Sequence, residues 1–396
     1  MVSLPATMKA VVFDGPHKVS VQERPVPAIK DERDIIVKVQ STALCGSELH
    51  TFRGLHESAT GFVMGHEFTG EVVVAGKDVK AVKVGDKVVC PFTTSWLVIK
   101  FCKKLRQEGL DPSACPVPGW LVGWKSIISD TLTSGDCFYC KSGTTGRCTE
   151  SLLLGCAKLD GAQAEYVRVP TADGTVMVAP KEINDNALIL MADIFPTGFF
   201  GVDNAFRNLG PAQKPSEAVA VVIGCGPVGL CAIVSALEYK PKHLFAIDSV
   251  ESRLELAKSL GAEPLNFVKD KEGMMARIKE VTEGRGADLV IEVVGLSPAL
   301  RTGFDVLRPF GFLSSIGVHN AEIPWTGEEA YDKNLRLQMG RCPVRSVFPD
   351  ALKVLAKNQH LFGFMFEKIM PLSQAVEGYD LFDKMKVQKV IFKPSE

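Results

Sequence analysis

The sequence has almost no net charge and lacks a block of basic residues. Its 45 lysines and arginines are balanced by 46 acidic residues, which gives a formal net charge of −1. A protein that binds nucleic acid normally carries a basic patch or stripe for the phosphates. This absence argues against a nucleic-acid partner and leaves a small molecule as the expected one.

The N-terminus lacks the features of a secretory signal. The opening residues, MVSLPATMKAVVF, contain neither a charged stretch nor a long apolar core. The eleven cysteines are odd in number and clustered, which favours thiols and metal sites over disulfides. We therefore expect a cytoplasmic protein in a reducing compartment.

A membrane span is also missing, although one stretch is long enough to be considered. Ala218–Leu237 contains twenty residues without a charge, the length of a helix that crosses a bilayer. Three glycines and a proline interrupt it. This punctuation predicts a buried strand, a turn and a helix, and no membrane association.

At 396 residues the chain is long for one domain, which predicts two. Residues 8–90 contain short β-branched runs separated by Gly, Pro and Asp, which are typical of strands. After about residue 218, apolar strands alternate with helical stretches such as Val228–Tyr239 and Glu251–Leu260. This alternation predicts an α/β fold with a doubly wound parallel sheet. The C-terminal part predicts a helix near 349–357 and a final strand in QKVIFKP.

A glycine-rich turn follows the first strand of the alternating part. GCGPVG places Gly224, Gly226 and Gly229 in the G-x-G-x-x-G spacing, which lets backbone N–H groups approach a pyrophosphate. Asp248 stands nineteen residues beyond Gly229, where an acid binds the ribose hydroxyls and repels a 2′-phosphate. The pattern predicts NAD rather than NADP. The alternative interpretation is that Asp248 caps the following helix.

Candidate metal ligands stand in three separate motifs. These motifs are CGSELH with Cys45, Ser47 and His50, MGHE with His66 and Glu67, and DIFPTG with Asp193. A thiolate, an imidazole and a carboxylate leave one tetrahedral position open for water or substrate, which is what catalytic zinc requires.

These motifs in this order, together with GDKVV and a three-cysteine segment, resemble the zinc-dependent medium-chain alcohol dehydrogenase family over nearly the whole chain. The resemblance implies that Cys45, His66 and Asp193 bind the catalytic zinc. Many members have cysteine at the position of Asp193, whereas branches that include some formaldehyde dehydrogenases have aspartate. The implied activity is hydride transfer between an alcohol and NAD, with an aldehyde or a ketone as the oxidised partner.

The same resemblance assigns the remaining site residues. Ser47 and His50 match the proton relay of the family, and Glu67 is expected either to orient the zinc site or to replace water on the metal transiently. The expected NAD-binding residues are Thr197, Gly224, Gly226, Pro227, Val228, Gly229, Asp248, Arg253, Val294 and Val318. Three of them, Thr197, Val294 and Val318, are expected near the nicotinamide.

The segment SGDCFYCKSGTTGRC lacks one cysteine that a structural zinc site needs. Cys137, Cys140 and Cys148 have the family spacing, but Ser134 stands where the fourth ligand is expected. Residues 96–134 fill 39 positions where the family has that one cysteine. Two explanations stay open: a natural surface insertion, and an in-frame intron translated within the gene.

The resemblance also implies a domain arrangement. We expect a GroES-like domain at 1–193 and 336–396 and a Rossmann domain at 194–335, with the zinc lobe at 135–148. A homo-oligomer, either a dimer or a tetramer, is expected.

Two alternative functions stay open: a non-catalytic or unstable NAD-binding product of a mis-spliced gene, and another medium-chain reductase. Primary, secondary, polyol and glutathione-adduct substrates are all compatible with the sequence.

Overall fold

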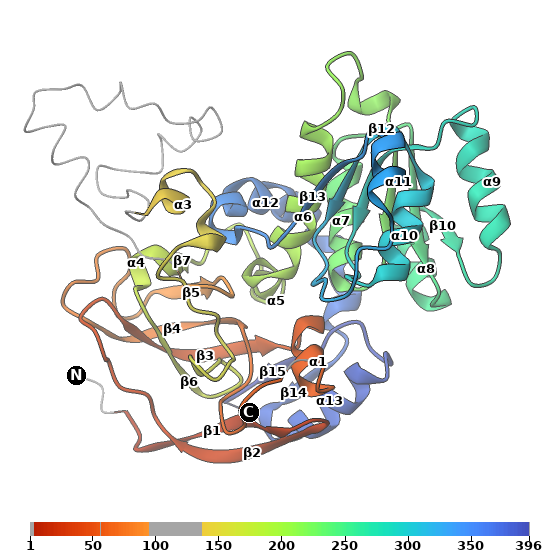
Figure 1. The fold of residues 1–396 in the computed structure, drawn as a ribbon. Helices are drawn as coiled ribbons and strands as arrows, with labels where there is room; N and C mark the ends of the chain where they lie inside the picture. Colours follow the sequence, from red (N-terminus) through yellow and green to blue (C-terminus); the bar gives the residue numbers. More distant parts are fainter. Residues whose placement is uncertain (1–3, 56, 95–136, 396) are drawn as a thin grey trace, which may run out of the picture. The chain divides into compact units, whose positions relative to one another are not determined.

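The computed structural model describes residues 4–55, 57–94 and 137–395. They form two compact units (Figure 1). The first unit comprises Met1–Pro180, Met370–Tyr379 and Ile391–Glu396, and the second comprises Lys181–Ile369 and Asp380–Val390. The predicted boundaries at residues 193 and 336 divide the chain by family domain rather than by compactness, and they stay predictions.

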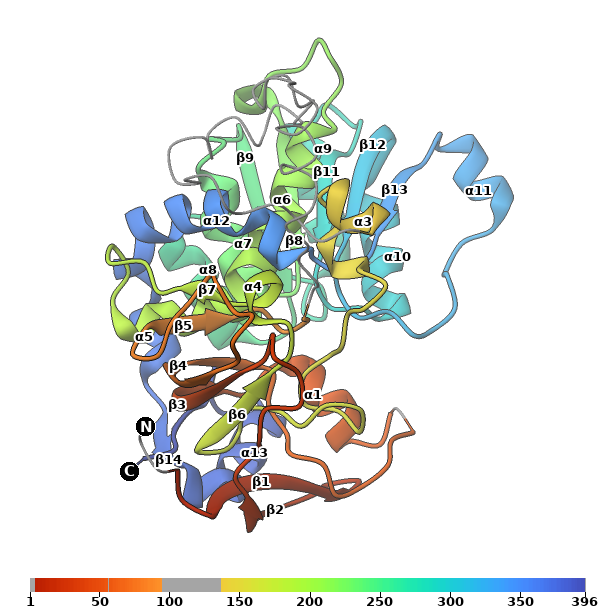
Figure 2. The ribbon, with the colours of Figure 1, turned by 90° about the vertical axis from the view of Figure 1, so that its left-hand side faces the viewer.

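The first unit is built on antiparallel strands. β1 (Thr7–Gly15) pairs with β2 (Lys18–Pro25) as a separate two-stranded ribbon (Figure 2). The larger sheet has the order β14-β15-β3-β4-β5-β7, and β6 also pairs with β3. Its strands are β3 (Ile35–Ala43), β4 (Glu67–Ala75), β5 (Lys87–Cys90), β6 (Tyr166–Val169), β7 (Met177–Val178), β14 (Ile369–Pro371) and β15 (Ile391–Lys393). Val37 and Val39 both enter its core, because alternate side chains of a strand share one face.

Short helices connect these strands. They are α1 (Gly46–Phe52), α3 (Phe138–Lys141), the 3-10 turn η3 (Thr145–Arg147) and α4 (Ala172–Thr175). Helix α1 directly follows β3, so the predicted motif CGSELH lies at the end of a central strand of the sheet.

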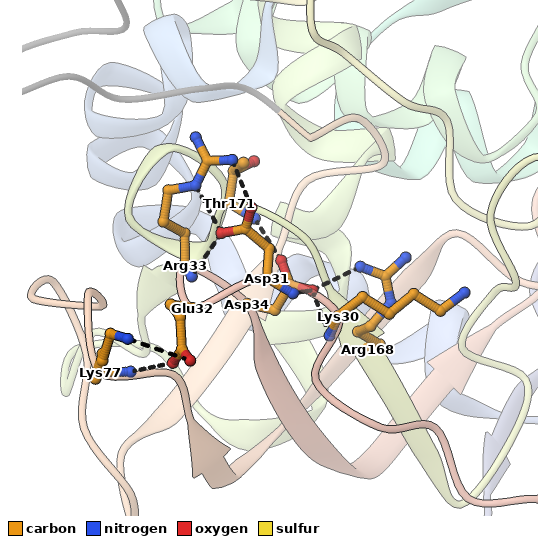
Figure 3. Close-up of polar contacts among 8 residues, drawn as sticks. All are labelled: Lys30, Asp31, Glu32, Arg33, Asp34, Lys77, Arg168 and Thr171. Atoms are coloured by element: carbon orange, nitrogen blue, oxygen red, sulfur yellow. Dashed lines mark hydrogen bonds and ion pairs between the residues drawn. The ribbon is translucent and has the colours of Figure 1, made fainter.

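A cluster of charges holds the loop that leads into β3 (Figure 3). Asp34 is 1% exposed and accepts hydrogen bonds from Arg168 Nη1 at 2.7 Å and from the N–H of Asp31 at 3.1 Å. Arg33 in turn donates to Asp31 and lowers the pKa of that carboxyl to about 2. Because Arg168 lies on β6, these bonds fasten the loop to a neighbouring strand. They help to define where β3 begins.

The second unit contains a parallel sheet of six strands in the order β10-β9-β8-β11-β12-β13. The strands are β8 (Val219–Ile223), β9 (His243–Asp248), β10 (Glu263–Asn266), β11 (Ala287–Glu292), β12 (Leu307–Ser315) and β13 (Arg336–Met339). This is the Rossmann order, in which the chain changes direction between β8 and β11. Ligands of such sheets bind beyond the carboxyl ends of the strands at this switch point.

Helices cover both faces of this sheet. The helices of the second unit are α5 (Asp185–Leu188), η4 (Ile189–Ala192), α6 (Ile194–Arg207), η5 (Pro215–Glu217), α7 (Pro227–Leu237), α8 (Glu251–Leu260), α9 (Lys271–Val281), α10 (Ser297–Val306), α11 (Gly327–Asp332), α12 (Val344–Asn358) and η6 (Gln359–Phe366). Helix α13 (Ala375–Asp383) and η7 (Leu372–Gln374) complete the chain. Val290 of β11 shares a core cluster with Leu300 of α10, whereas the adjacent Ile291 lies against Gly201 of α6.

Most predicted elements are present with small differences at their ends. The helix predicted at Val228–Tyr239 is α7, which begins and ends slightly earlier, and the predicted Glu251–Leu260 coincides with α8. The helix predicted near 349–357 begins earlier, at Val344, and the final strand is shorter than its motif. Ala218–Leu237 contains a strand, a turn and a helix, as predicted. Within the described residues, no helix combines the length and the apolar character that crossing a membrane requires.

Candidate metal and cofactor sites

The pairing of β3 with β4 brings Cys45 and His66 together. Ala43 is the register partner of Glu67, so the residues just beyond the end of β3 lie beside the residue that precedes β4. Cys45 is the N-cap of α1. Gly65, which precedes His66, has φ +100, and a Cβ there would collide with Gln163, so only glycine permits this backbone conformation packed against Gln163.

Cys45, His66 and Glu67 offer three donor atoms that all lie within 4.8 Å of one another. Cys45 and His66 are each 6% exposed and Glu67 is fully buried. The hydroxyl of Ser47 lies 3.3 Å from Cys45 Sγ and 3.3 Å from His66 Nε2. A thiolate and an imidazole at this spacing, with a carboxylate beside them, are donors of the kind that zinc prefers.

Glu48 orients the imidazole of His66. Its Oε1 lies 3.4 Å from His66 Nδ1, and its Oε2 accepts the backbone N–H of Cys45 at 3.0 Å. A proton on Nδ1 leaves the lone pair of Nε2 available to a metal, and this carboxylate–histidine pairing is common in zinc proteins. The residues present therefore fit a zinc ion.

Ser47 and His50, the predicted relay residues, both lie on α1 and are both partly exposed. A separation of three residues places two side chains on one face of a helix. Ser47 contacts the donor atoms, and His50 lies on the same face of α1, nearer the end of the helix.

Asp193 lies in the second unit, between η4 and α6. It is 9% exposed, and Thr197 Oγ1 donates to its Oδ1 at 2.7 Å. Asp193 is also the N-cap residue of α6, and the N–H of Thr197 donates to its carbonyl oxygen at 2.9 Å. Burial, together with the charge of Asp193, raises the pKa of the nearby Cys342 thiol well above its usual range.

The turn after β8 has the geometry of a phosphate-binding loop. Gly224 has φ +94, and a Cβ on it would lie 2.6 Å from Val294. A Cβ on Gly229 would collide with the carbonyl oxygen of Gly224. Gly226 is the N-cap of α7, with Pro227 at its first position and Val228 next. The glycines thus let the helix start close against the strand end, where its N–H groups can receive a phosphate.

Asp248 ends β9 and supports the same turn. Its Oδ2 accepts the N–H of Cys225 at 2.7 Å, and its Oδ1 accepts those of Ser249 and Val250 at 2.7 and 2.9 Å. The N-cap of α8 is Val250, so the alternative interpretation of Asp248 as the N-cap is wrong. The guanidinium of Arg253 lies 3.9 Å from the position that a Cβ on Gly226 would take, so a cation faces the turn.

Val294 and Val318 lie on adjoining loops after β11 and β12. A Cβ on Gly295, between them in space, would collide with the backbone of Val318. Glu292 is fully buried and fixes the loop after β11 and the end of β12. Its carboxylate accepts the N–H groups of Val294 and Gly295 at 2.7 and 2.6 Å and the hydroxyl of Ser315 at 2.7 Å.

The sulfur atoms of Cys137, Cys140 and Cys148 lie within 4.8 Å of one another. Burial raises the pKa of Cys140, and the neighbouring thiols raise it further. Burial also opposes ionisation of Cys137, but N–H groups of Thr149 and Cys140 donate to its sulfur and lower its pKa to about 7. The fourth position, Ser134, and the whole insertion lie outside the described residues.

Two family models match the chain in the order that the sequence predicted. The model of the alcohol dehydrogenase GroES-like domain matches residues 31–125, and that of the zinc-binding dehydrogenase matches residues 227–357. A zinc-type alcohol dehydrogenase B of Aspergillus flavus is 61% identical over 389 residues, which cover 98% of this chain and 82% of the relative. The chain belongs to the zinc-dependent medium-chain alcohol dehydrogenase family.

Two further relatives agree with this assignment. A medium chain reductase/dehydrogenase of an Acremonium species is 53% identical to this dehydrogenase over 330 residues, 83% of this chain and 99% of the relative. The solved structure of an alcohol dehydrogenase from Thermus sp. ATN1 has a TM-score of 0.80 and 30% identity, and 98% and 99% of the two chains are covered. The predicted family, the α/β fold class, and zinc-dependent alcohol dehydrogenase chemistry with NAD, the typical cofactor of the family, are confirmed.

Sequence reasoning missed Glu48 and Glu292, and it missed Gln163, whose Nε2 lies 3.3 Å from the carboxylate oxygens of Glu48. Glu48 stands three residues after the N-cap Cys45, which is the spacing of a capping box. Glu292 is the one charge within the apolar run LVIEVV. Both signals could have identified these residues, whereas Gln163 carries no such signal.

Proposed function

We propose that this dehydrogenase oxidises an alcohol at a zinc ion held by Cys45, His66 and Asp193 and transfers the hydride to NAD. The observation that carries the proposal is the buried group of Cys45, His66 and Glu67, with Ser47 against both donor atoms. Bound zinc would act as a Lewis acid that lowers the pKa of the alcohol hydroxyl. The family resemblance supports Asp193 as the third ligand.

Proton movement would fall to the residues of α1. In the proposal, Ser47 Oγ accepts the proton of the alcohol and passes its own to His50, which releases it to solvent. The position of the Ser47 hydroxyl against Cys45 Sγ and His66 Nε2 supports this role. The buried carboxylate of Glu67 adds negative charge beside the donors and would thereby favour a cation there.

Cofactor binding would fall to the second unit. NAD supplies the hydride acceptor, and the protein orients it. The pyrophosphate would lie on the turn that contains Gly224, Gly226 and Gly229. In this arrangement Asp248 would accept hydrogen bonds from the ribose hydroxyls, since its Oδ2 accepts one hydrogen bond from the protein, that of the Cys225 N–H. Arg253 would lie beside the phosphates.

The nicotinamide would lie against three side chains, those of Thr197, Val294 and Val318. The hydrogen bonds that Glu292 accepts from Val294 and from Ser315, at the end of β12, support this assignment. We also propose that the enzyme is a cytoplasmic homo-oligomer, as the family resemblance implies.

A metal analysis combined with an activity assay tests the proposal. Cys45→Ser should lose the catalytic zinc and almost all NADH formation with an alcohol panel, and Asp193→Asn should bind zinc more weakly. Cys156→Ser is the matched control, because Cys156 belongs to neither group of metal donors. Native zinc content and full activity in Cys45→Ser would contradict the proposal.

A further inference from the structure

A buried chain of polar side chains continues from Glu48 away from the proposed zinc ligands. Gln163 Nε2 lies 3.3 Å from each carboxylate oxygen of Glu48, and the Tyr379 hydroxyl lies 2.9 Å from Gln163 Oε1. Gln163 and Tyr379 are both fully buried, and Glu48 is 5% exposed. Three segments that are far apart in the sequence therefore meet in one network inside the first unit.

The chemistry of the three groups fixes the direction of these hydrogen bonds. A glutamine amide can present either its oxygen or its NH₂ group to a neighbour. An ionised carboxylate only accepts, so the NH₂ group of Gln163 faces Glu48. Tyr379 then donates its O–H to the amide oxygen. Burial, with the charge of Glu48, raises the pKa of Tyr379 well above its usual range, so the hydroxyl keeps its proton.

The amide of Gln163 restrains the carboxylate that faces His66. Glu48 already receives the N–H of Cys45 on Oε2, and its Oε1 lies 3.4 Å from His66 Nδ1. Because the Gln163 amide lies close to both oxygens, it limits rotation of the carboxylate away from the imidazole. The orientation of His66, and with it the direction of the Nε2 lone pair, then depends on Gln163.

Tyr379 is itself held firmly. It lies on α13, and its ring packs against Phe52, with ring centroids 5.1 Å apart. Phe52 is the last residue of α1, the helix that also carries Glu48. The hydroxyl that fixes the Gln163 amide is thus anchored to the same helix as the carboxylate that the amide restrains.

We propose that Gln163 and Tyr379 are positioning residues of the zinc site. Tyr379 fixes the amide of Gln163, Gln163 fixes the carboxylate of Glu48, and Glu48 holds His66 for the metal. The inference rests on the proposed function, because it takes His66 Nε2 as a zinc ligand. It extends the site to a residue 216 positions away from Gln163 in the sequence.

The test uses the zinc-loaded full chain and its Tyr379→Phe variant, which loses one hydroxyl and keeps the ring. Changes in the groups that orient metal ligands typically lower metal affinity by about 10- to 100-fold. For this more distant group we expect release of zinc to a chelator to become about 3- to 10-fold faster. The visible absorption of the cobalt-substituted protein, which reports ligand geometry, should change as well.

Tyr239→Phe is the matched control. The hydroxyl of Tyr239 also donates a short hydrogen bond, to Asp203 Oδ1 at 2.7 Å, but both residues belong to the second unit and neither belongs to this network. Its zinc release and cobalt spectrum should equal those of the native protein. Gln163→Met, which keeps the length of the side chain without its polar atoms, should release zinc at least as fast as Tyr379→Phe.

A different result is expected if Tyr379 has only a structural role. Tyr379→Phe would then melt at a lower temperature but release zinc at the native rate when folded, with an unchanged cobalt spectrum, and this result would overturn the inference. Cys45→Ser provides the reference for zinc bound elsewhere in the chain. Native zinc content in Cys45→Ser would refute the proposed function itself, whereas loss of zinc there with native release in both Tyr379→Phe and Gln163→Met would refute only the positioning role.

Discussion

In the proposed function, the carboxylate of Asp248 binds both backbone N–H groups and the cofactor. It accepts hydrogen bonds from the N–H of Cys225 in the glycine-rich turn and from those of Ser249 and Val250 after β9, and in the proposed function it also binds the ribose of NAD. We expect Asp248→Ser to lower the preference for NAD over NADP by about tenfold or more, equivalent to ~1.4 kcal/mol, because a 2′-phosphate would no longer face the negative charge of a carboxylate. The ratio of kcat/KM for the two cofactors measures this.

Asp248→Ser should also lower the thermal midpoint, since it removes hydrogen bonds to buried backbone groups. Asp270→Ala is a suitable control for that effect. Asp270 caps α9 through a 2.7 Å bond from the N–H of Gly273 and belongs to another helix. Asp270→Ala should lose stability without changing cofactor preference. A native NAD preference in Asp248→Ser would show that Asp248 is structural only.

At the scale of elements, Gly226 and Gly229 have different roles in the turn between β8 and α7. A Cβ on Gly226 would meet no protein atom closer than 3.9 Å, whereas one on Gly229 would collide with Gly224. Gly226→Ala should therefore fold normally and raise the Kd for NAD about tenfold or more, because the methyl group would stand where a phosphate must approach. Gly229→Ala should lower the thermal midpoint even without cofactor.

Calorimetry with and without NAD distinguishes these outcomes. Equal NAD affinity in Gly226→Ala and the native protein would mean that the pyrophosphate does not lie on this turn. A native midpoint in Gly229→Ala would mean that helix and strand can separate without cost.

The ends of elements were predictable where a local signal marks them. Helix α8 ends at Leu260 because Gly261 takes the left-handed conformation, with φ +112, that most commonly ends a helix at glycine. The predicted start of helix α12 was too late. The helix contains Pro349 in its interior, although proline normally stands only in the first turn of a helix. The proline therefore gave a misleading signal for where the helix begins.

At the scale of the whole molecule, predictability depended on sequence distance. The glycine-rich turn is one compact motif, and the roles of Cys45 and His66 were implied by the resemblance of their motifs to those of the family. The contact of Gln163 with Tyr379 joins residues 216 positions apart, and neither residue belongs to a motif. Only the folded chain brings such residues together, and a single sequence contains no signal for it.

The three-cysteine lobe gives a prediction about zinc stoichiometry. Cys137, Cys140 and Cys148 supply three sulfur donors, whereas a structural zinc site needs four ligands. The printed chain should bind about one zinc per subunit, and Ser134→Cys should bind about two and melt at a higher temperature, because metal binding contributes directly to folding. The same gain is expected when residues 96–134 are replaced by one cysteine.

Metal analysis of the purified proteins tests this stoichiometry. Adding Cys140→Ser to Ser134→Cys should return the content to about one zinc. Two zinc ions in the unaltered chain would show that another residue already completes the lobe and that the insertion is part of a working protein. Transcript sequencing across the junction would identify a translated intron directly.

The most direct measurement of the central claim is NADH formation before and after zinc is removed from the native enzyme. The panel should contain a primary alcohol, a secondary alcohol, a polyol and a glutathione adduct. We expect at least one substrate to be oxidised, the rate to fall with the zinc content during chelation, and activity to return when zinc is restored to Cys45 and His66. An undiminished rate in the metal-free protein, or no oxidation of any alcohol by the zinc-loaded one, would contradict the account.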